Sequence, residues 1–203
     1  MRSSAAEVNP VSITVLLSES GTEYMGNLDL AIAAHDYVLV GRVERQIGTR
    51  HLDGYAYPLT DFEVTILNVI KGKLYAGQKI PITKHGGISK DKSTMALESI
   101  NDFIPETGGV YIFLVGVWQD GKTLQCSPTH HTIVPLESSI VTELNQIEES
   151  TGSNKDKQEL ISKSLQKSKI FARYAAAAKN KNAEKELPLE IQEIERHKSV
   201  YEK

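Results

Sequence analysis

The sequence contains one cysteine, Cys126, among 203 residues. A single cysteine excludes an intramolecular disulfide framework and any metal site that needs several thiolates. Cys126 alternates with Leu124 in a short apolar run. Because this alternation is typical of a strand with one buried face, we expect a buried cysteine rather than a reactive thiol.

Long hydrophobic runs are also missing. No stretch reaches the roughly 18 apolar residues that a membrane-crossing helix needs. The chain begins Met1-Arg-Ser-Ser-Ala-Ala6 and continues directly into polar sequence, without the apolar segment of a signal peptide. Two localisations stay open at this point: a cytoplasmic protein, or an exported protein whose signal peptide has been removed.

The short motifs of common hydrolases are absent. There is no G-x-S-x-G nucleophile elbow and no H-E-x-x-H zinc motif. His130 and His131 are adjacent, and adjacent strand residues point to opposite faces, so the pair is poorly placed to bind one ion. We therefore predict no catalytic residue, no metal site and no cofactor.

Charge of one sign is not in excess. The formal net charge is −3, which predicts no strong attraction to nucleic acid. Residues 155–185 are the exception, with nine Lys or Arg and three Asp or Glu. Their lysines do not gather opposite the apolar stripe, so we expect a solvated helix packed on another element rather than a membrane-surface helix.

Short β-branched runs fill residues 36–87, each ended by glycine or a polar turn, as is typical of consecutive strands. Similar runs precede and follow. We expect strands at 11–17, 37–44, 61–70, 79–84, 111–118, 124–126 and 132–136, a helix at 28–34 capped by Asn27 or Asp29, and polar connections at 46–58 and 89–98.

One detail favours a small closed barrel. Leu67 and Val69 make the far end of their strand apolar on its second face too, as in a strongly curved barrel covered on its outside. Pro81 cannot donate a ladder hydrogen bond, so its strand should lie at an edge or carry a bulge. The run 111–118 is the most continuous apolar stretch and the natural central strand.

From Ser138 onward the short apolar runs ended by turn residues give way to apolar residues at helical spacing. One helix should end near Thr151-Gly152, and a capping box at Ser153 should open a longer helix that runs to about Asn182. Pro188 suits the first turn of a final helix.

The predicted fold class is therefore α+β, mainly β: a five-to-six-stranded OB-type β-barrel followed by a C-terminal helical segment. We expect an N-terminal extension over 1–27, the barrel over 28–137 and the helical segment over 138–203.

Candidate binding residues cluster in the long connection 46–58, because extended excursions between strands often carry ligand contacts. Others lie where strands end in histidines. The full candidate set is Arg50, His51, Tyr55, Tyr57, His85, His130 and His131.

The order of strands and glycines resembles the netrin-like modules typified by the tissue inhibitors of metalloproteinases. It is more similar still to bacterial exported proteins of that type. The segments that carry the resemblance span about residues 28–137: Ala33-Ala-His-Asp-Tyr-Val-Leu-Val-Gly-Arg-Val43, Phe62-Glu-Val-Thr-Ile-Leu-Asn-Val-Ile-Lys-Gly72, Gly77-Gln-Lys-Ile80, Gly86-Gly87, Gly109-Val-Tyr-Ile-Phe-Leu114 and Ile133-Val-Pro135.

The inhibitors of this family chelate a protease zinc through an N-terminal cysteine braced by disulfides. This chain starts at Met1 and has only Cys126, so that mechanism does not transfer. The resemblance implies an extracellular or cell-envelope binding module that is not an enzyme, with an unknown protein or envelope polymer as partner. Two alternatives stay open: an OB protein that binds single-stranded nucleic acid, and a metal-dependent hydrolase using the histidines.

Overall fold

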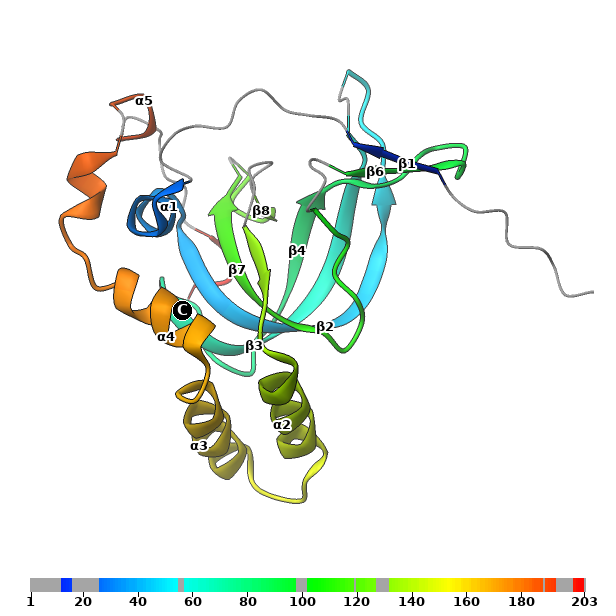
Figure 1. The fold of residues 1–203 in the computed structure, drawn as a ribbon. Coiled ribbons are helices and arrows are strands. Elements are labelled where there is room, and N and C mark those ends of the chain that lie inside the picture. Colours follow the sequence, from blue (N-terminus) through cyan, green and yellow to red (C-terminus); the bar gives the residue numbers. More distant parts are fainter. Residues whose placement is uncertain are drawn as a thin grey trace, which may run out of the picture.

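The computed structural model describes residues 12–15, 26–54, 57–97, 102–118, 120–126, 132–187, 189–192 and 199–202. Five strands form a closed barrel in the order β2-β3-β4-β8-β7, and β7 returns to pair with β2 (Figure 1). Within this barrel β4 and β8 pair in parallel, and the other strand pairs are antiparallel. This confirms the predicted OB-type barrel. The strands are β2 (Tyr37–Arg50), β3 (Leu59–Lys71), β4 (Lys79–His85), β7 (Val110–Val117) and β8 (Leu124–Cys126).

Strand β2 is longer than its hydrophobic pattern predicted. The sequence indicated a strand ending at Glu44 and a loop from residue 46, but polar residues 45–50 stay paired with β3 as far as Arg50↔Leu59. Register shifts interrupt this ladder at four points, and such bulges bend a strand around a barrel. The predicted loop is therefore shorter, and Arg50 lies on the sheet.

A small second sheet lies at one end of the barrel (Figure 1). It contains β1 (Ser12–Val15), β6 (Thr94–Leu97) and β5 (Gly87–Ile88), with β1 parallel to β6. The prediction of a polar loop over 89–98 was wrong here, because the chain reverses after Ile88 and pairs β6 with β5. Strand β9 (Ile133–Pro135) extends along β7 beyond β8.

Pro81 occupies the position that its chemistry requires. It pairs with Glu63 of β3, while the described part of β8 pairs with Thr83 and Lys84 on the other side of β4. Its missing N–H therefore breaks no β4–β8 hydrogen bond. Cys126 is fully buried, as the alternation predicted.

Apolar side chains of the described residues fill two main cores and one smaller cluster around Ala33, Ala183 and Leu187. The barrel interior holds one, centred on Phe62, Ile82 and Phe113. The second lies between the outer surface of β2, β3 and β7 and the helices, where Leu67 meets Leu144 and Ile161. Leu67 is thus buried on the outside of the barrel, as expected from a strand that is apolar on both faces. The described residues include no helix long and apolar enough to cross a membrane.

The helical segment is more broken than its periodicity predicted. The helices are α1 (Leu28–Ala34), α2 (Ser138–Glu149), α3 (Asn154–Leu165), α4 (Lys169–Ala177), η2 (Ala183–Glu186) and α5 (Leu189–Gln192).

The prediction of a single helix from Ser153 to Asn182 was wrong, because Ser168 caps a new helix, α4. Its hydroxyl accepts from the Phe171 amide and donates to Glu137 at 2.6 Å, which fixes the break against the start of α2. The Asn27 and Ser153 caps are as predicted.

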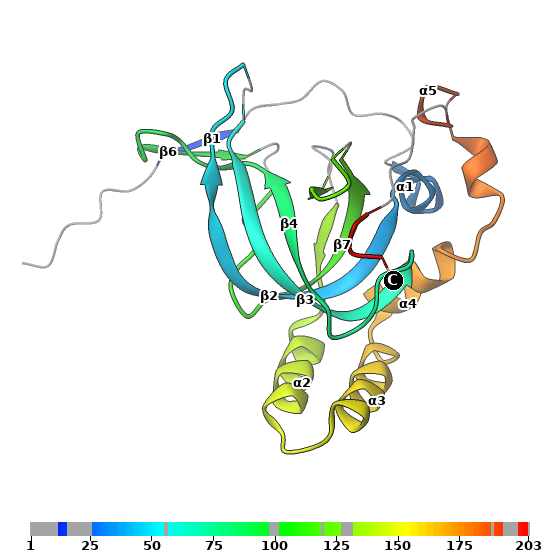
Figure 2. The same ribbon diagram turned by 180° about the vertical axis from the view of Figure 1, so that it is seen from behind.

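Residues 199–202 return to the barrel and contact the end at which β2 begins (Figure 2). Tyr201 packs against the barrel core, and its carbonyl accepts from Gln78 Nε2 at 2.9 Å. The buried Tyr37 hydroxyl donates to Glu202 Oε1 at 2.6 Å. Burial and the Glu202 carboxylate both raise the pKa of Tyr37, so Tyr37 stays a neutral donor.

We expect Glu202→Ala to lower the free energy of unfolding by about 1.5 kcal/mol, because it leaves the Tyr37 hydroxyl buried without this acceptor. Urea denaturation of Glu202→Ala, Tyr37→Phe and the double variant measures the coupling. The double variant should lose less than the sum of the single variants. Glu186→Ala, at an exposed position, is the control. Strict additivity would show that the tail is not held by this pair.

Candidate functional site

The structure brings four of the candidate residues to one end of the barrel. Arg50 ends β2, and Leu59 at the start of β3 pairs with both Arg50 and His85. Tyr57 lies in the connection before β3, and its ring centroid is 6.5 Å from that of His85. His51 follows Arg50. The other three candidates, Tyr55, His130 and His131, lie outside the described residues.

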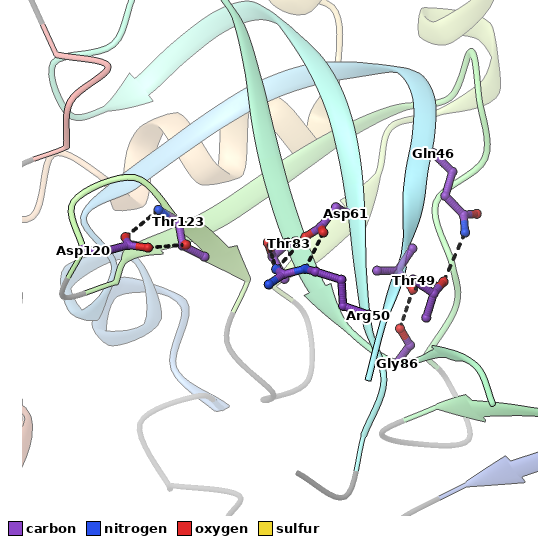
Figure 3. A network of polar contacts seen from close by, with 9 residues as sticks. Gln46, Thr49, Arg50, Asp61, Thr83, Gly86, Asp120 and Thr123 are labelled. Carbon is purple, nitrogen blue, oxygen red and sulfur yellow. Dashed lines mark hydrogen bonds and ion pairs between the residues drawn. The ribbon is translucent and has the colours of Figure 1, made fainter. Parts of the chain in front are cut away.

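Arg50 is held in a fixed orientation on the outer surface of β3 and β4. Its Nε and Nη2 donate to the two carboxylate oxygens of Asp61 at 2.6 and 2.9 Å, and Thr83 Oγ1 donates to Asp61 at 2.7 Å (Figure 3). Two parallel bonds from a guanidinium fork are strong and directional. Arg50 nevertheless keeps 46% of its side chain exposed, so part of its donor edge faces solvent.

The turn between β7 and β8 adds a second carboxylate to this end. Asp120 accepts from the Lys122 and Thr123 amides and the Thr123 hydroxyl, each at 2.7 Å. These bonds lower the pKa of Asp120, so it is charged at neutral pH. Hydrogen bonding to Asp61 raises the pKa of Arg50, and the charges of Asp61 and Asp120 add to that effect. Figure 3 shows Asp120 with Thr123 on one side of the group formed by Arg50, Asp61 and Thr83.

His85 is buried and uncharged. Burial, and then the neighbouring Lys84 ammonium, lower its pKa from 6.5 to about 4. Its Nε2 contacts the side chain of Gln125, whose strand β8 closes the barrel. In a neutral imidazole one ring nitrogen donates and the other accepts, so His85 Nε2 takes either role toward Gln125 according to the tautomer.

An ion pair lies beneath this surface. Lys84 is 5% exposed and donates from Nζ to Asp102 Oδ2 at 2.8 Å and to the His85 carbonyl at 2.7 Å. The Thr60 hydroxyl donates to the Gly86 carbonyl at 2.7 Å. Gly86 has φ of 105°, so the sharp turn predicted for Gly86-Gly87 is present and needs glycine. These bonds brace the ends of β3 and β4.

The histidines do not form a shared ion site in the part of the chain that the structure describes. His51 is exposed, and its Nε2 lies 3.0 Å from the Ile88 carbonyl oxygen, while His85 contacts Gln125. Among the described residues no three His, Cys, Asp or Glu side chains converge as metal ligands would.

Sequence reasoning missed Lys84, Asp102, Asp120 and Gln125. A signal existed for Lys84, because Ile80 and Ile82 point inward and the two-residue period places Lys84 on the same face. Asp120 was read only as a turn residue. No sequence pattern links Asp102 to Lys84, since they meet through the fold.

The resulting surface is a rigid set of hydrogen-bonding groups between two connections. We call it the barrel-end face, formed by Arg50, Asp61, Thr83, Asp120 and Gln125. Exposed apolar side chains flank it: Leu52 in the first connection is 45% exposed, and Trp118 in the second is 49% exposed. Such a surface can orient a partner without performing chemistry on it.

No protein-family model matches this chain, and no curated protein is significantly similar to it.

Protein stability should fall as pH drops from 6.5 toward 4. The unfolded chain takes up a proton at His85 near pH 6.5, whereas the folded protein takes it up only near pH 4. The loss due to this group is on the order of 3 kcal/mol. Urea denaturation at several pH values should show a shallower slope for His85→Gln, while exposed His51→Gln keeps the parent slope. An unchanged slope in His85→Gln would contradict the buried neutral histidine.

Removing Asp102 should be more damaging than removing a surface carboxylate. Asp102→Ala leaves the buried Lys84 ammonium without its counter-ion and should cost about 3 kcal/mol of unfolding free energy. Replacing both residues, with Lys84→Met and Asp102→Leu, should recover most of that loss. Chemical denaturation of the three proteins measures it. A cost below about 1 kcal/mol for Asp102→Ala would show a solvent-screened pair instead.

Proposed function

We propose that this protein is a non-enzymatic binding module and that the barrel-end face contacts its partner. The observation that carries this proposal is the position of the face. It covers the outer surface of β3 and β4, which are the second and third strands of the barrel in chain order. It lies between the connection from β2 to β3 and the connection from β7 to β8. OB-type barrels use this surface for ligands.

The state of the ionisable groups favours binding over catalysis. A general acid or base works best with a pKa near the working pH. Here the pKa of His85 is about 4, and that of Asp120 is lowered further from neutrality by its hydrogen bonds. Asp61 is bound by Arg50 and Thr83. Each group is thus committed to holding the surface in one geometry.

The composition of the face favours a protein or an envelope polymer as partner. The fixed polar groups are flanked by the exposed side chains of Leu52 and Trp118. Protein interfaces commonly combine directional hydrogen bonds with apolar anchor residues of this kind. Arg50 is neutralised by Asp61, which weakens the case for a nucleic acid, whose phosphates need uncompensated cations. The resemblance to exported netrin-like proteins supports a role outside the cytoplasm.

Site-specific photocrosslinking tests this assignment. A photoreactive phenylalanine analogue is placed at Leu52, at Trp118, or at Leu160, an equally exposed position on α3. In intact cells or isolated envelopes, the first two positions should give the same adduct, and Leu160 should give none. Arg50→Ala should reduce that adduct at least about fivefold, through loss of charged hydrogen bonds.

Two results would overturn the proposal. Identical adducts from all three positions would indicate non-specific proximity, and their absence from Leu52 and Trp118 would leave the face without a partner. A parallel titration with a fluorescent single-stranded oligonucleotide addresses the alternative. Saturable binding that weakens steeply with salt would favour the nucleic-acid function instead.

A further inference from the structure

A polar cleft of about 530 Å³ lies between the barrel and the α2–α3 hairpin. This volume falls within the range of about 300–1,000 Å³ typical of small-molecule sites. Strands β2, β3 and β4 form one wall, the connection after β3 forms the rim, and the hairpin forms the other wall. The side chains that matter below are Arg42, Glu44, Lys79, Glu148, Lys157 and Gln158, with Tyr75 at the rim.

This cleft is separate from the barrel-end face. Both lie on the outer side of β3, but Asp61 pairs with Thr83 whereas the cleft begins at the pair Thr65↔Lys79. The intervening row, Glu63 with Pro81, separates them. A ligand in the cleft therefore uses a different set of residues from those in the proposed function.

The hydrogen-bond acceptors in the cleft are the carboxylates of Glu44 and Glu148, which both contact the Arg42 guanidinium. Arg42 donates to Glu44 Oε1 at 3.0 and 3.2 Å and lies 3.4 Å from Glu148 Oε2. Partial burial raises the pKa of Glu44, but Thr65 and Arg42 lower it by more, so Glu44 is ionised. Arg42 contacts one oxygen of each carboxylate, so each carboxylate keeps acceptor capacity for ligand hydroxyl groups.

Donors come from a different part of the wall. Lys79 is exposed, and with the described residues it makes only a longer-range electrostatic interaction with Glu44. Lys157 Nζ donates to the Glu148 carbonyl at 2.5 Å and has two further hydrogens. The amides of Asn154 and Gln158 stand beside it on α3. Three cationic and two anionic side chains leave the lining with one net positive charge.

We propose that this cleft binds an acidic saccharide, a sugar unit bearing both hydroxyl groups and a carboxylate. Sugar hydroxyls donate and accept at once, which matches a lining where carboxylates alternate with amides and ammonium groups. Tyr75 offers a ring at the rim against which the C–H face of a sugar can pack. The ligand carboxylate takes the position beside Lys79, whose positive charge has no close counter-ion among the residues that the structure describes.

Other small ligands fit less well. A nucleotide would place a doubly charged phosphate beside Glu44 and Glu148, and the few apolar residues of the lining, such as Leu67 and Ala76, cannot enclose a planar base. A free amino acid would leave most of the amides and carboxylates without hydroxyl partners, and unpaired polar groups are costly.

The assignment gives the helical hairpin a part in ligand binding. Glu148 comes from the last turn of α2, and Lys157 from α3 bonds its carbonyl, so the two helices present one polar wall. Arg42 joins that wall to β2 through Glu148. The cleft therefore exists only where the hairpin is docked on the barrel.

Titration with a galacturonic acid dimer, followed by NMR or calorimetry, tests the proposal. Galactose supplies hydroxyls without a carboxylate, and glutamate supplies a carboxylate without the hydroxyls. We expect saturable uronate binding, weaker galactose binding and no glutamate binding. Lys79→Gln should weaken uronate at least about tenfold and leave galactose unchanged. Gln158→Ala should weaken both sugars.

Lys90→Gln is the matched control, because Lys90 is an exposed lysine outside the cleft lining. Arg50→Ala should leave uronate binding intact, so failure of this proposal is distinguishable from failure of the barrel-end face. The proposal is overturned if the uronate does not bind, if Lys79→Gln weakens it no more than Lys90→Gln, or if glutamate binds equally well.

Discussion

The barrel depends on a very short seam. Among the described residues, strands β4 and β8 meet in parallel through two residue pairs, Thr83↔Gln125 and Lys84↔Cys126, and without this pairing the sheet would stay open. Side-chain hydrogen bonds and an ion pair add to the few backbone hydrogen bonds of this seam. On the outside Thr83 bonds Asp61, and inside Lys84 bonds Asp102. Thr83 and Gln125 therefore belong both to the seam and to the barrel-end face, so part of that face also closes the barrel.

That shared role explains why the polar groups at the seam are locked rather than reactive. A buried lysine needs a partner carboxylate, and a histidine that is itself buried, with that lysine beside it, has a lowered pKa and stays neutral. Both requirements are met at Lys84 and His85. Groups held in this way cannot easily exchange protons during a reaction, but they can present an unchanging pattern of donors and acceptors.

The sequence was sufficient for the barrel and for most element positions, because strand period and turn residues are local signals. It failed where a distant contact decides local structure. Polar residues 45–50 continue β2 because β3 pairs with them, and the long predicted helix breaks at Ser168 because Glu137 bonds it there. For the candidate site, loop length and strand ends pointed to Arg50 and His85, which the structure places at the same end of the barrel. It could not find Asp102 or the cleft, which exist only through tertiary packing.

Charge compensation is the reason that sequence composition could not locate either surface. Along the outside of the barrel, Arg50 pairs with Asp61, Arg45 with Glu63 and Arg42 with Glu44, at 2.6, 3.2 and 3.0 Å. The charge of each arginine is balanced by a carboxylate on the same sheet, so the net charge of the sequence does not reveal these three ion pairs. A surface of this kind attracts ligands only weakly over long distances. A partner that bound there would be selected at contact, through bond direction. Among the described residues, Lys79 has no close counter-ion.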